Sequence, residues 1–317
     1  MQMKRKTIVP TTSSTRALVA GSAGLVVAIA IFLWKPTVLV YGLQRAGLYA
    51  AIAIPMALVL GIVHIVNLSH GEFMMVAAYL TYFAAKLLGL DPLVAMVPVS
   101  IVMSVFGFAV YRLTIRRALR APELNQLILT FGLGIALSQS INLLFTSQSW
   151  NLSLDYVTSS ATVGNYSFGT YDFVFVVAAI VFAGGLRLFL TRTRMGKAAL
   201  AVGQNPRGAA IVGIDVDRAY AFVFSLSVGL IGLMGALFLT KQAIFPTVGG
   251  PYTMKSFCLV AMAGVGNITG VLWGSLALGL AEVAMTNVRA LRDWSSIVFF
   301  VIIIATILVR AIRERKA

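Results

Sequence analysis

The residues best placed to do chemistry lie in one polar stretch, His64 to Glu72, which follows a long apolar run. Ser69 and Glu72 have the spacing of a capping box, in which a hydroxyl and a carboxylate bind free N–H groups at the start of a helix. An acidic side chain beside a membrane-spanning run is also a candidate for a transport path. The sequence leaves both roles open for this pair.

Metal and catalytic sites have little support in the sequence. The spacing of His64, His70 and Glu72 is not that of the HExxH zinc motif, and no further group of strong metal ligands lies nearby in the sequence. We therefore expect no bound metal. The single cysteine, Cys258, excludes an internal disulfide. We expect no cofactor. Because the chain lacks a GxxxxGKS/T motif, we also expect no ATP hydrolysis by the chain itself. A membrane enzyme that uses the two histidines and Glu72 is the catalytic alternative.

The composition is typical of a membrane protein that crosses the bilayer many times. Of the 317 residues, 59% are hydrophobic and 11% are charged, whereas a soluble globular chain has about 25% charged residues. The net charge of +15 gathers at the ends of apolar runs, which indicates topology signals rather than a nucleic-acid surface. We therefore predict an all-α bundle of about nine to ten transmembrane spans.

Hydropathy places these spans along almost the whole chain. The predicted spans are Ala17–Trp34, Leu39–Val63, Gly71–Leu88, Leu93–Ile115, Gln126–Phe145, Asp172–Leu190, Ala219–Thr240, Met254–Val265, Val271–Met285 and Ser296–Val309. The segment 254–265 is too short to cross comfortably at a rise of 1.5 Å per residue, so we expect a half-span inside the protein.

The basic residues predict the orientation of the chain. Cytoplasmic segments carry an excess of Lys and Arg, which places the basic N-terminus 1–16, the loop 191–218 and the basic C-terminus 311–317 inside the cell. Residues 17–310 then form the transmembrane domain, and the loop 146–171 lies outside. This loop is rich in Ser, Thr, Asn and Tyr and contains Trp150. It is either an aromatic belt at the membrane surface or a docking surface for an external binding protein.

The loop 191–218 contains a short helix with clear start and stop signals. Asn205 suits the N-cap, Pro206 the first helical position, and Gly213 the residue just past the end. Ala209 to Val212 give this helix an apolar face flanked by basic residues. Such a helix either docks on a soluble partner or lies on the lipid headgroups.

Two polar breaks interrupt the apolar pattern, at His64 to Glu72 and at Phe245 to Pro251. Paired breaks hint at a duplicated half and point to a substrate path. A third stretch, Ala263 to Gly270, is dense in glycine, with Gly274 and Gly279 after it, which favours tight helix packing beside a pore. Glu282, inside a predicted span, needs a basic partner such as Lys255 or Arg45.

Three motifs together resemble the membrane permeases of the branched-chain amino acid ABC importer family. The resemblance runs from about Leu43 to Ile304. The motifs are Asn67-Leu-Ser-His70-Gly71-Glu72-Phe73, then Arg194-Met-Gly196-Lys-Ala198 followed by Ala209 to Gly213 and Asp217-Arg218, and finally Gly264-x-Gly266-Asn-Ile-x-Gly270 closing with Gly279-x-x-Glu282. The chain departs from the family in its C-terminal segment, which lacks the usual Pro-x-Gly-Leu-Phe-Gly ending, and in its long extension before Leu39.

The resemblance implies a bacterial inner-membrane complex of two permeases, two ATP-binding cassette ATPases and an extracytoplasmic solute-binding protein. It also implies that the loop 191–218 docks on the ATPase. We expect the substrate path at Asn67, Ser69, His70, Gly71, Glu72, Gly264, Gly266 and Gly270, and the ATPase contact at Arg194, Gly196, Asn205, Pro206, Ala209, Ala210, Ile211, Gly213 and Asp217. Few charges line the spans, which favours a small apolar amino acid as the solute. Urea or short amides, or a stand-alone secondary transporter, are the alternatives.

Overall fold

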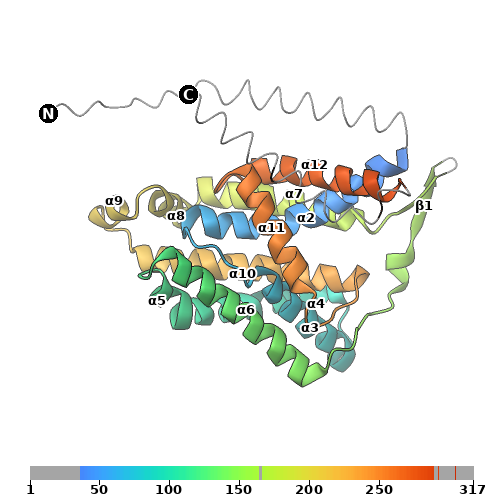
Figure 1. Ribbon diagram of the computed structural model, residues 1–317, viewed down its shortest axis with the longest axis horizontal. Coiled ribbons are helices and arrows are strands. Elements are labelled where there is room, and N and C mark those ends of the chain that lie inside the picture. The colour runs from blue at the N-terminus through green and yellow to red at the C-terminus, as the bar shows by residue number, and fades with distance from the viewer. Residues whose placement is uncertain (1–35, 164–165, 289–291, 293–303, 305–317) are drawn as a thin grey trace.

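The computed structural model describes residues 36–163, 166–288, 292 and 304. These residues form a bundle of long helices, which confirms the all-α prediction, and the one departure is a short hairpin (Figure 1). The predicted span Ala17–Trp34, nearly all of Ser296–Val309 and both basic termini lie outside the described residues.

The described elements follow one another in this order. They are α2 (Pro36–Ile62), α3 (His70–Leu88), α4 (Pro92–Val110), the π-helix η1 (Tyr111–Ile115), α5 (Arg116–Ala118), α6 (Glu123–Phe145), the 3-10 helix η2 (Asp155–Thr158), β1 (Ser160–Val163), β2 (Tyr166–Gly169), α7 (Phe173–Arg192), α8 (Arg194–Gln204), α9 (Pro206–Ile211), α10 (Val216–Lys241), α11 (Gly249–Ala263) and α12 (Ile268–Thr286).

Six of the described helices are long and apolar enough to cross a membrane: α2, the continuous run Pro92–Ala118, α6, α7, α10 and α12. Each matches a span predicted from hydropathy. The predicted half-span is α11, which has 15 residues and lies oblique to the long helices (Figure 1). Helix α3 also forms where it is predicted, but its polar residues leave it outside the group of six.

Helices α2 and α10 form the centre of the bundle. In the most apolar 18-residue stretches of α2 and α10, 83% and 72% of the residues are buried, whereas the share in α6 is 11%. Small residues on α2 explain its central place, because they allow neighbouring backbones to approach closely. An ideal Cβ on Gly47 would lie 2.6 Å from Val176 N of α7, and one on Gly279 of α12 would lie 2.6 Å from Ala46 N.

The two central helices run antiparallel between two ends of the bundle. At the hairpin end, near β1 and β2, Tyr41 Oη donates to Ser167 O at 3.0 Å, and Lys241 pairs with Asp172 at 3.3 Å. At the opposite end, which we call the α9 end, the last turn of α2 packs against Gly203 of α8. Helix α2 therefore starts at the hairpin end, and α10 finishes there (Figure 1).

The loop 146–171 contains more structure than its polar composition indicates. Strands β1 and β2 pair antiparallel, with Ser160 opposite Gly169. Trp150 is partly buried: its backbone pairs with Ile244, and its ring packs against Tyr82 and Phe145. Tyr156 Oη donates to Asp91 Oδ1 at 3.1 Å, and partial burial together with this bond raises the pKa of Tyr156. The loop is thus tied down at both the α4 and the α10 side.

The glycine contacts of α2 and α12 predict a selective loss of stability. Gly47→Ala or Gly279→Ala places a methyl group against a neighbouring backbone, so we expect each to destabilise the fold by about 1–3 kcal/mol. Gly185→Ala is the matched control, because nothing lies within 4 Å of its added Cβ. Thermal unfolding of the purified protein in detergent measures the difference. Equal midpoints for Gly279→Ala and Gly185→Ala would contradict this packing.

Candidate functional site

The two polar breaks predicted from the sequence meet inside the bundle. One break joins α2 to α3 and the other joins α10 to α11. Helices α3 and α11 therefore both begin where the two breaks meet, a place that we call the crossing. An ideal Cβ on Gly249 would lie 2.5 Å from Gly71 C, and one on Gly71 would overlap Gly249 O. The two breaks therefore touch backbone to backbone. Two antiparallel long helices, each followed by a break and a further helix, match the duplicated arrangement that the sequence hints at.

Buried polar side chains of the first break bind nearby polar groups. Asn67 Oδ1 accepts hydrogen bonds from Ser69 Oγ at 2.7 Å and from Ser69 N at 3.2 Å. His70 Nε2 lies 2.8 Å from Ile52 O, which fixes the start of α3 about halfway along α2. Irregular backbone at membrane depth is tolerated only where protein or a watery cavity surrounds it. Part of the protein that surrounds this irregular backbone comes from Asn67, Ser69 and His70.

The predicted capping box is not formed. Ser69 is the N-cap residue of α3, but its hydroxyl makes no cap hydrogen bond because Asn67 Oδ1 binds it instead. Glu72 Oε2 accepts from Thr253 Oγ1 of α11 at 3.1 Å, and Thr253 Oγ1 accepts from Gly71 N at 2.7 Å. The Glu72 side chain thus reaches across to the second break rather than back to the start of its own helix.

A cavity of about 410 Å³ opens beside this crossing. Its walls come from the first break and α3, from the second break and α11, and from α6. The lining residues are Leu68, Glu72, Phe131, Gly134, Ile135, Ser138, Gln139, Thr247, Gly250, Thr253 and Met254. Of the predicted path residues, only Glu72 lines this cavity, whereas Asn67, Ser69, His70 and Gly71 support it from behind. The role of α6 as a wall has no signal in the sequence that we recognise.

The glycine run lies elsewhere in the bundle. An ideal Cβ on Gly61, at the end of α2, would lie 2.5 Å from Gly266 Cα. Gly270 N donates to Asn267 Oδ1 at 2.9 Å, which caps α12. Gly264, Gly266 and Gly270 therefore join α11 and α12 at the α9 end, and none of them lines the cavity beside Glu72. Gly266 packs against Gly61 of α2, and the place of all three glycines in a substrate path stays a prediction.

The short helix α9 has the start and the end that its sequence predicts. Asn205 Oδ1 accepts from Gly208 N at 2.9 Å, Pro206 is the first residue, and Gly213 follows the helix with φ 85°. Ala209 packs with Val202 of α8 and Ala219 of α10. Ala210 is exposed, as are the side chains of Ile211 and Val212, at 86% and 75%. The helix is thus anchored on one face and apolar on the other.

The remaining residues of this loop fasten α8, α9 and α10 to the bundle. Arg194 opens α8, whose N-cap Thr193 accepts from Gly196 N at 2.9 Å. Asp217 pairs with Arg116 at 3.0 Å and with Arg112 at 3.3 Å, and it accepts from Tyr111 Oη at 2.9 Å. Asp217 therefore ties the start of α10 to η1 and its neighbours, a positioning role that the motif alone does not reveal.

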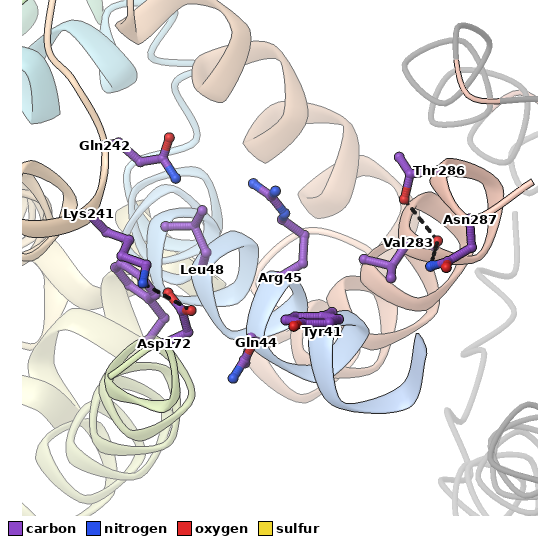
Figure 2. A pocket seen from close by; sticks show the side chains of 11 residues that line it. Tyr41, Gln44, Arg45, Leu48, Asp172, Lys241, Gln242, Val283, Thr286 and Asn287 are labelled. Atoms are coloured by element: carbon purple, nitrogen blue, oxygen red, sulfur yellow. Dashed lines mark hydrogen bonds and ion pairs between the residues drawn. The ribbon is translucent and has the colours of Figure 1, made fainter. Parts of the chain in front are cut away.

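A second polar cluster and cavity lie closer to the hairpin end. Glu282 Oε2 lies 2.5 Å from Tyr49 Oη and 3.4 Å from Lys255 Nζ, so the predicted pairing with Lys255 is confirmed, and Tyr49 joins it unpredicted. Figure 2 shows Arg45 and the Lys241–Asp172 pair around the nearby cavity of about 360 Å³. This cluster fastens α11 to α2 and α12.

The metal-site alternative gains nothing from the geometry. His70 is buried against Ile52, whereas His64 is exposed, with φ 58° in the first break. Among the described residues, no group of three His, Cys, Asp or Glu side chains is arranged to hold a metal ion.

Comparison with known proteins places the chain in a transport family. Residues 38–307 match the family described as branched-chain amino acid transport system / permease component. The chain belongs to this permease family. The match includes both breaks, α9 and all six membrane-length helices.

The similar proteins are themselves permeases. The chain is 30% identical over 292 residues to the high-affinity branched-chain amino acid transport system permease protein BraD of Pseudomonas aeruginosa, covering 86% of this chain and 92% of that protein. It is 27% identical over 283 residues to LivH of Salmonella typhimurium, with 84% and 91% covered. A shorter match, 27% over 161 residues, is to the fructose import permease protein FrcC of Rhizobium meliloti, covering 49% of this chain and 44% of that protein. No solved structure matches the chain.

The Lys255–Glu282 pair gives a testable prediction about this permease. The side chains are 23% and 20% exposed, so removing one partner leaves a charge with poor solvation. We expect Lys255→Met or Glu282→Gln to destabilise the protein by about 3 kcal/mol, and the double variant to lose less than either single variant. Thermal unfolding of the three variants in detergent tests this. Additive losses would show that the pair does not couple α11 to α12.

Proposed function

We propose that this chain is the permease subunit of an ATP-driven importer that moves branched-chain amino acids or related small solutes across the bacterial inner membrane. The observation that carries the proposal is the meeting of two helix breaks beside one cavity, in a chain of the branched-chain amino acid permease family. Broken helices that meet inside a bundle are a recurrent way to build a solute site in a membrane protein.

The charge distribution supports the orientation predicted from the sequence. We place the α9 end in the cytoplasm and the loop 146–171 outside, because most of the described cations lie at the α9 end. These are Arg112, Arg116, Arg117, Arg120, Arg187, Arg192, Arg194, Lys197, Arg207 and Arg218. If the spans predicted at 17–34 and 296–309 also cross the membrane, this orientation puts both termini in the cytoplasm. An external binding protein would dock at the hairpin end.

Helix α9 is the proposed contact with the ATPase. Its exposed Ile211 and Val212 offer an apolar patch beside the cations of the same loop, which suits a groove in a soluble partner. Because Ala209 packs on α8 and α10, a displacement of α9 is passed to α10. The far end of α10 leads into the second break, so ATP-driven movement at α9 reaches the cavity through one helix.

The second permease is proposed to cover the open side of the cavity. Helix α6 is the least buried of the six membrane-length helices, and its Phe131 and Ile135 are both exposed and part of the cavity wall. A cavity whose wall faces out of the bundle needs a further surface to close it. An identical or homologous subunit on this face would complete the path, with lipid around the remaining apolar surface.

The coupling role of α9 predicts a specific loss of assembly. The double substitution Ala210→Asp with Ile211→Asp places two carboxylates on the exposed apolar face, so we expect ATPase binding to weaken on the order of tenfold or more. Insertion into the membrane should remain, because both side chains are exposed. Co-purification with the ATPase subunits measures the effect, and Ser153→Asp in the opposite loop is the control. Normal co-purification of the double variant would remove α9 from the interface.

The energy source and the solute are tested together in proteoliposomes. Proteoliposomes that contain two permease subunits and the ATPases, together with the external binding protein, should accumulate leucine only when ATP reaches the ATPases. They should accumulate leucine in preference to urea. Uphill uptake by the permease alone, driven by an ion gradient, would identify a secondary transporter instead. ATP-driven uptake of urea but not of leucine would keep the mechanism and replace the proposed solute.

A further inference from the structure

The cavity beside Glu72 has an unusual charge pattern. Glu72 is the one charged residue among those lining it, and no described Lys, Arg or His forms an ion pair with Glu72. By contrast, Glu282, the other acidic residue placed inside a span, is paired with Lys255. A carboxylate at membrane depth is costly unless a positive group accompanies it. A positive group that accompanies an ionised Glu72 at this depth therefore comes from outside the described residues.

The carboxyl group of Glu72 is held by one side chain and is reachable from the cavity. Thr253 Oγ1 is 3.1 Å from Glu72 Oε2. Two glycines lie beside the carboxyl group, Gly134 of α6 and Gly250 of α11. An ideal Cβ on Gly134 would lie 3.6 Å from Glu72 Cδ, and one on Gly250 would lie 3.8 Å from Glu72 Oε1. Two glycines at van der Waals distance leave free space where most residues would place a side chain.

The surrounding backbone stabilises the charge of Glu72 without neutralising it. Glu72 lies in the first turn of α3, and α11 begins at Gly249, which touches Gly71. A helix N-terminus carries roughly half a positive charge, so two of them near one carboxylate offset part of the cost of burying its charge. They do not replace a mobile cation, because their partial charges are fixed in the backbone behind the cavity.

The rest of the wall restricts what that cation can be. Leu68, Phe131, Ile135 and Met254 provide an apolar surface, and Ser138, Gln139 and Thr247 provide a few neutral polar groups. A cavity of about 410 Å³ falls within the range of small-molecule sites, about 300–1,000 Å³. Glu72 supplies the one carboxylate of this wall, whereas a Ca²⁺ site usually combines several charged and neutral oxygen ligands. An organic ammonium with an aliphatic side chain satisfies both the carboxylate and the apolar wall.

From this pattern we infer that Glu72 receives the ammonium group of the transported amino acid, while Phe131, Ile135 and Met254 contact its aliphatic side chain. The inference rests on the proposed function and adds to it a named subsite and the orientation of the solute. It also accounts for the two glycines, because a side chain at Gly134 or Gly250 would occupy the space next to the carboxylate. Solutes without a cationic group, such as urea, lose the main attraction of the site.

The test uses a reporter cysteine that needs neither ATP nor a binding protein. Since Cys258 is the single cysteine, Cys258→Ser gives a cysteine-free chain, and Ser138→Cys then places one thiol in the cavity wall. In membranes containing the full chain, we compare how fast this thiol reacts with 2-aminoethyl methanethiosulfonate, which carries an ammonium, and with the anionic 2-sulfonatoethyl reagent. Glu72→Gln should lower the cation-to-anion rate ratio on the order of tenfold. Glu123→Gln, at the exposed start of the same α6, should leave the ratio unchanged.

Protection experiments identify the group that Glu72 binds. Leucine should slow the labelling, whereas 4-methyl-2-oxopentanoate, with the same carbon skeleton and no ammonium, should not. Gly134→Ala, which keeps the charge and fills the space, should retain the rate ratio and lose the protection by leucine, and it decides the question if Glu72→Gln fails to fold. An unchanged ratio in Glu72→Gln, or equal effects of leucine and the keto acid, would overturn the inference. Failure of ATP-driven uptake in the wild-type complex would instead overturn the proposed function.

Discussion

The backbone contact between Gly71 and Gly249 is the constraint on which the rest of the structure depends. It brings two irregular segments together at membrane depth, where each unpaired backbone group is costly. Side chains around the contact form hydrogen bonds with some of these backbone groups. Thr253 accepts from Gly71 N, and Thr130 Oγ1 donates to Val66 O at 3.1 Å. Only glycine permits so close an approach, so the cavity, the start of α3 and the start of α11 all follow from two residues without side chains.

The crossing also explains why the central helices are so strongly buried. Helices α2 and α10 each lead into one of the breaks, and a shift of either would separate Gly71 from Gly249. Ser227 Oγ of α10 donates to Pro55 O of α2 at 2.7 Å, which satisfies a carbonyl in the middle of α2. Small residues on α2 hold α7 and α12 close on its other sides. The bundle is therefore tightly packed around the crossing, and its outer helices α4 and α6 carry much of the exposed apolar surface.

How far the sequence predicts this protein depends on how local each feature is. Hydropathy finds the described spans because each span is a continuous apolar run, and Asn205, Pro206 and Gly213 mark α9 because capping involves neighbouring residues. The capping box at Ser69 is wrong because Asn67, two residues earlier, binds the same hydroxyl. The hairpin within 160–169 is missed because a polar loop composition gives no strong strand signal. The sequence locates both breaks, but their meeting joins residues about 180 positions apart, such as Gly71 and Thr253.

The two intramembrane carboxylates differ in how their charges are accompanied. Glu282 is bound on its own chain by Lys255 and Tyr49, and its surroundings join three helices, α2, α11 and α12. Among the described residues, Glu72 is bound by one side chain, the neutral Thr253, and it lies beside two glycines and an open cavity. If Glu72 served only to fasten α3 to α11, a neutral side chain that binds Thr253 would serve equally well and would avoid the cost of a charge at this depth. A site for a solute that brings its own positive charge gives the carboxylate a physical reason to be there.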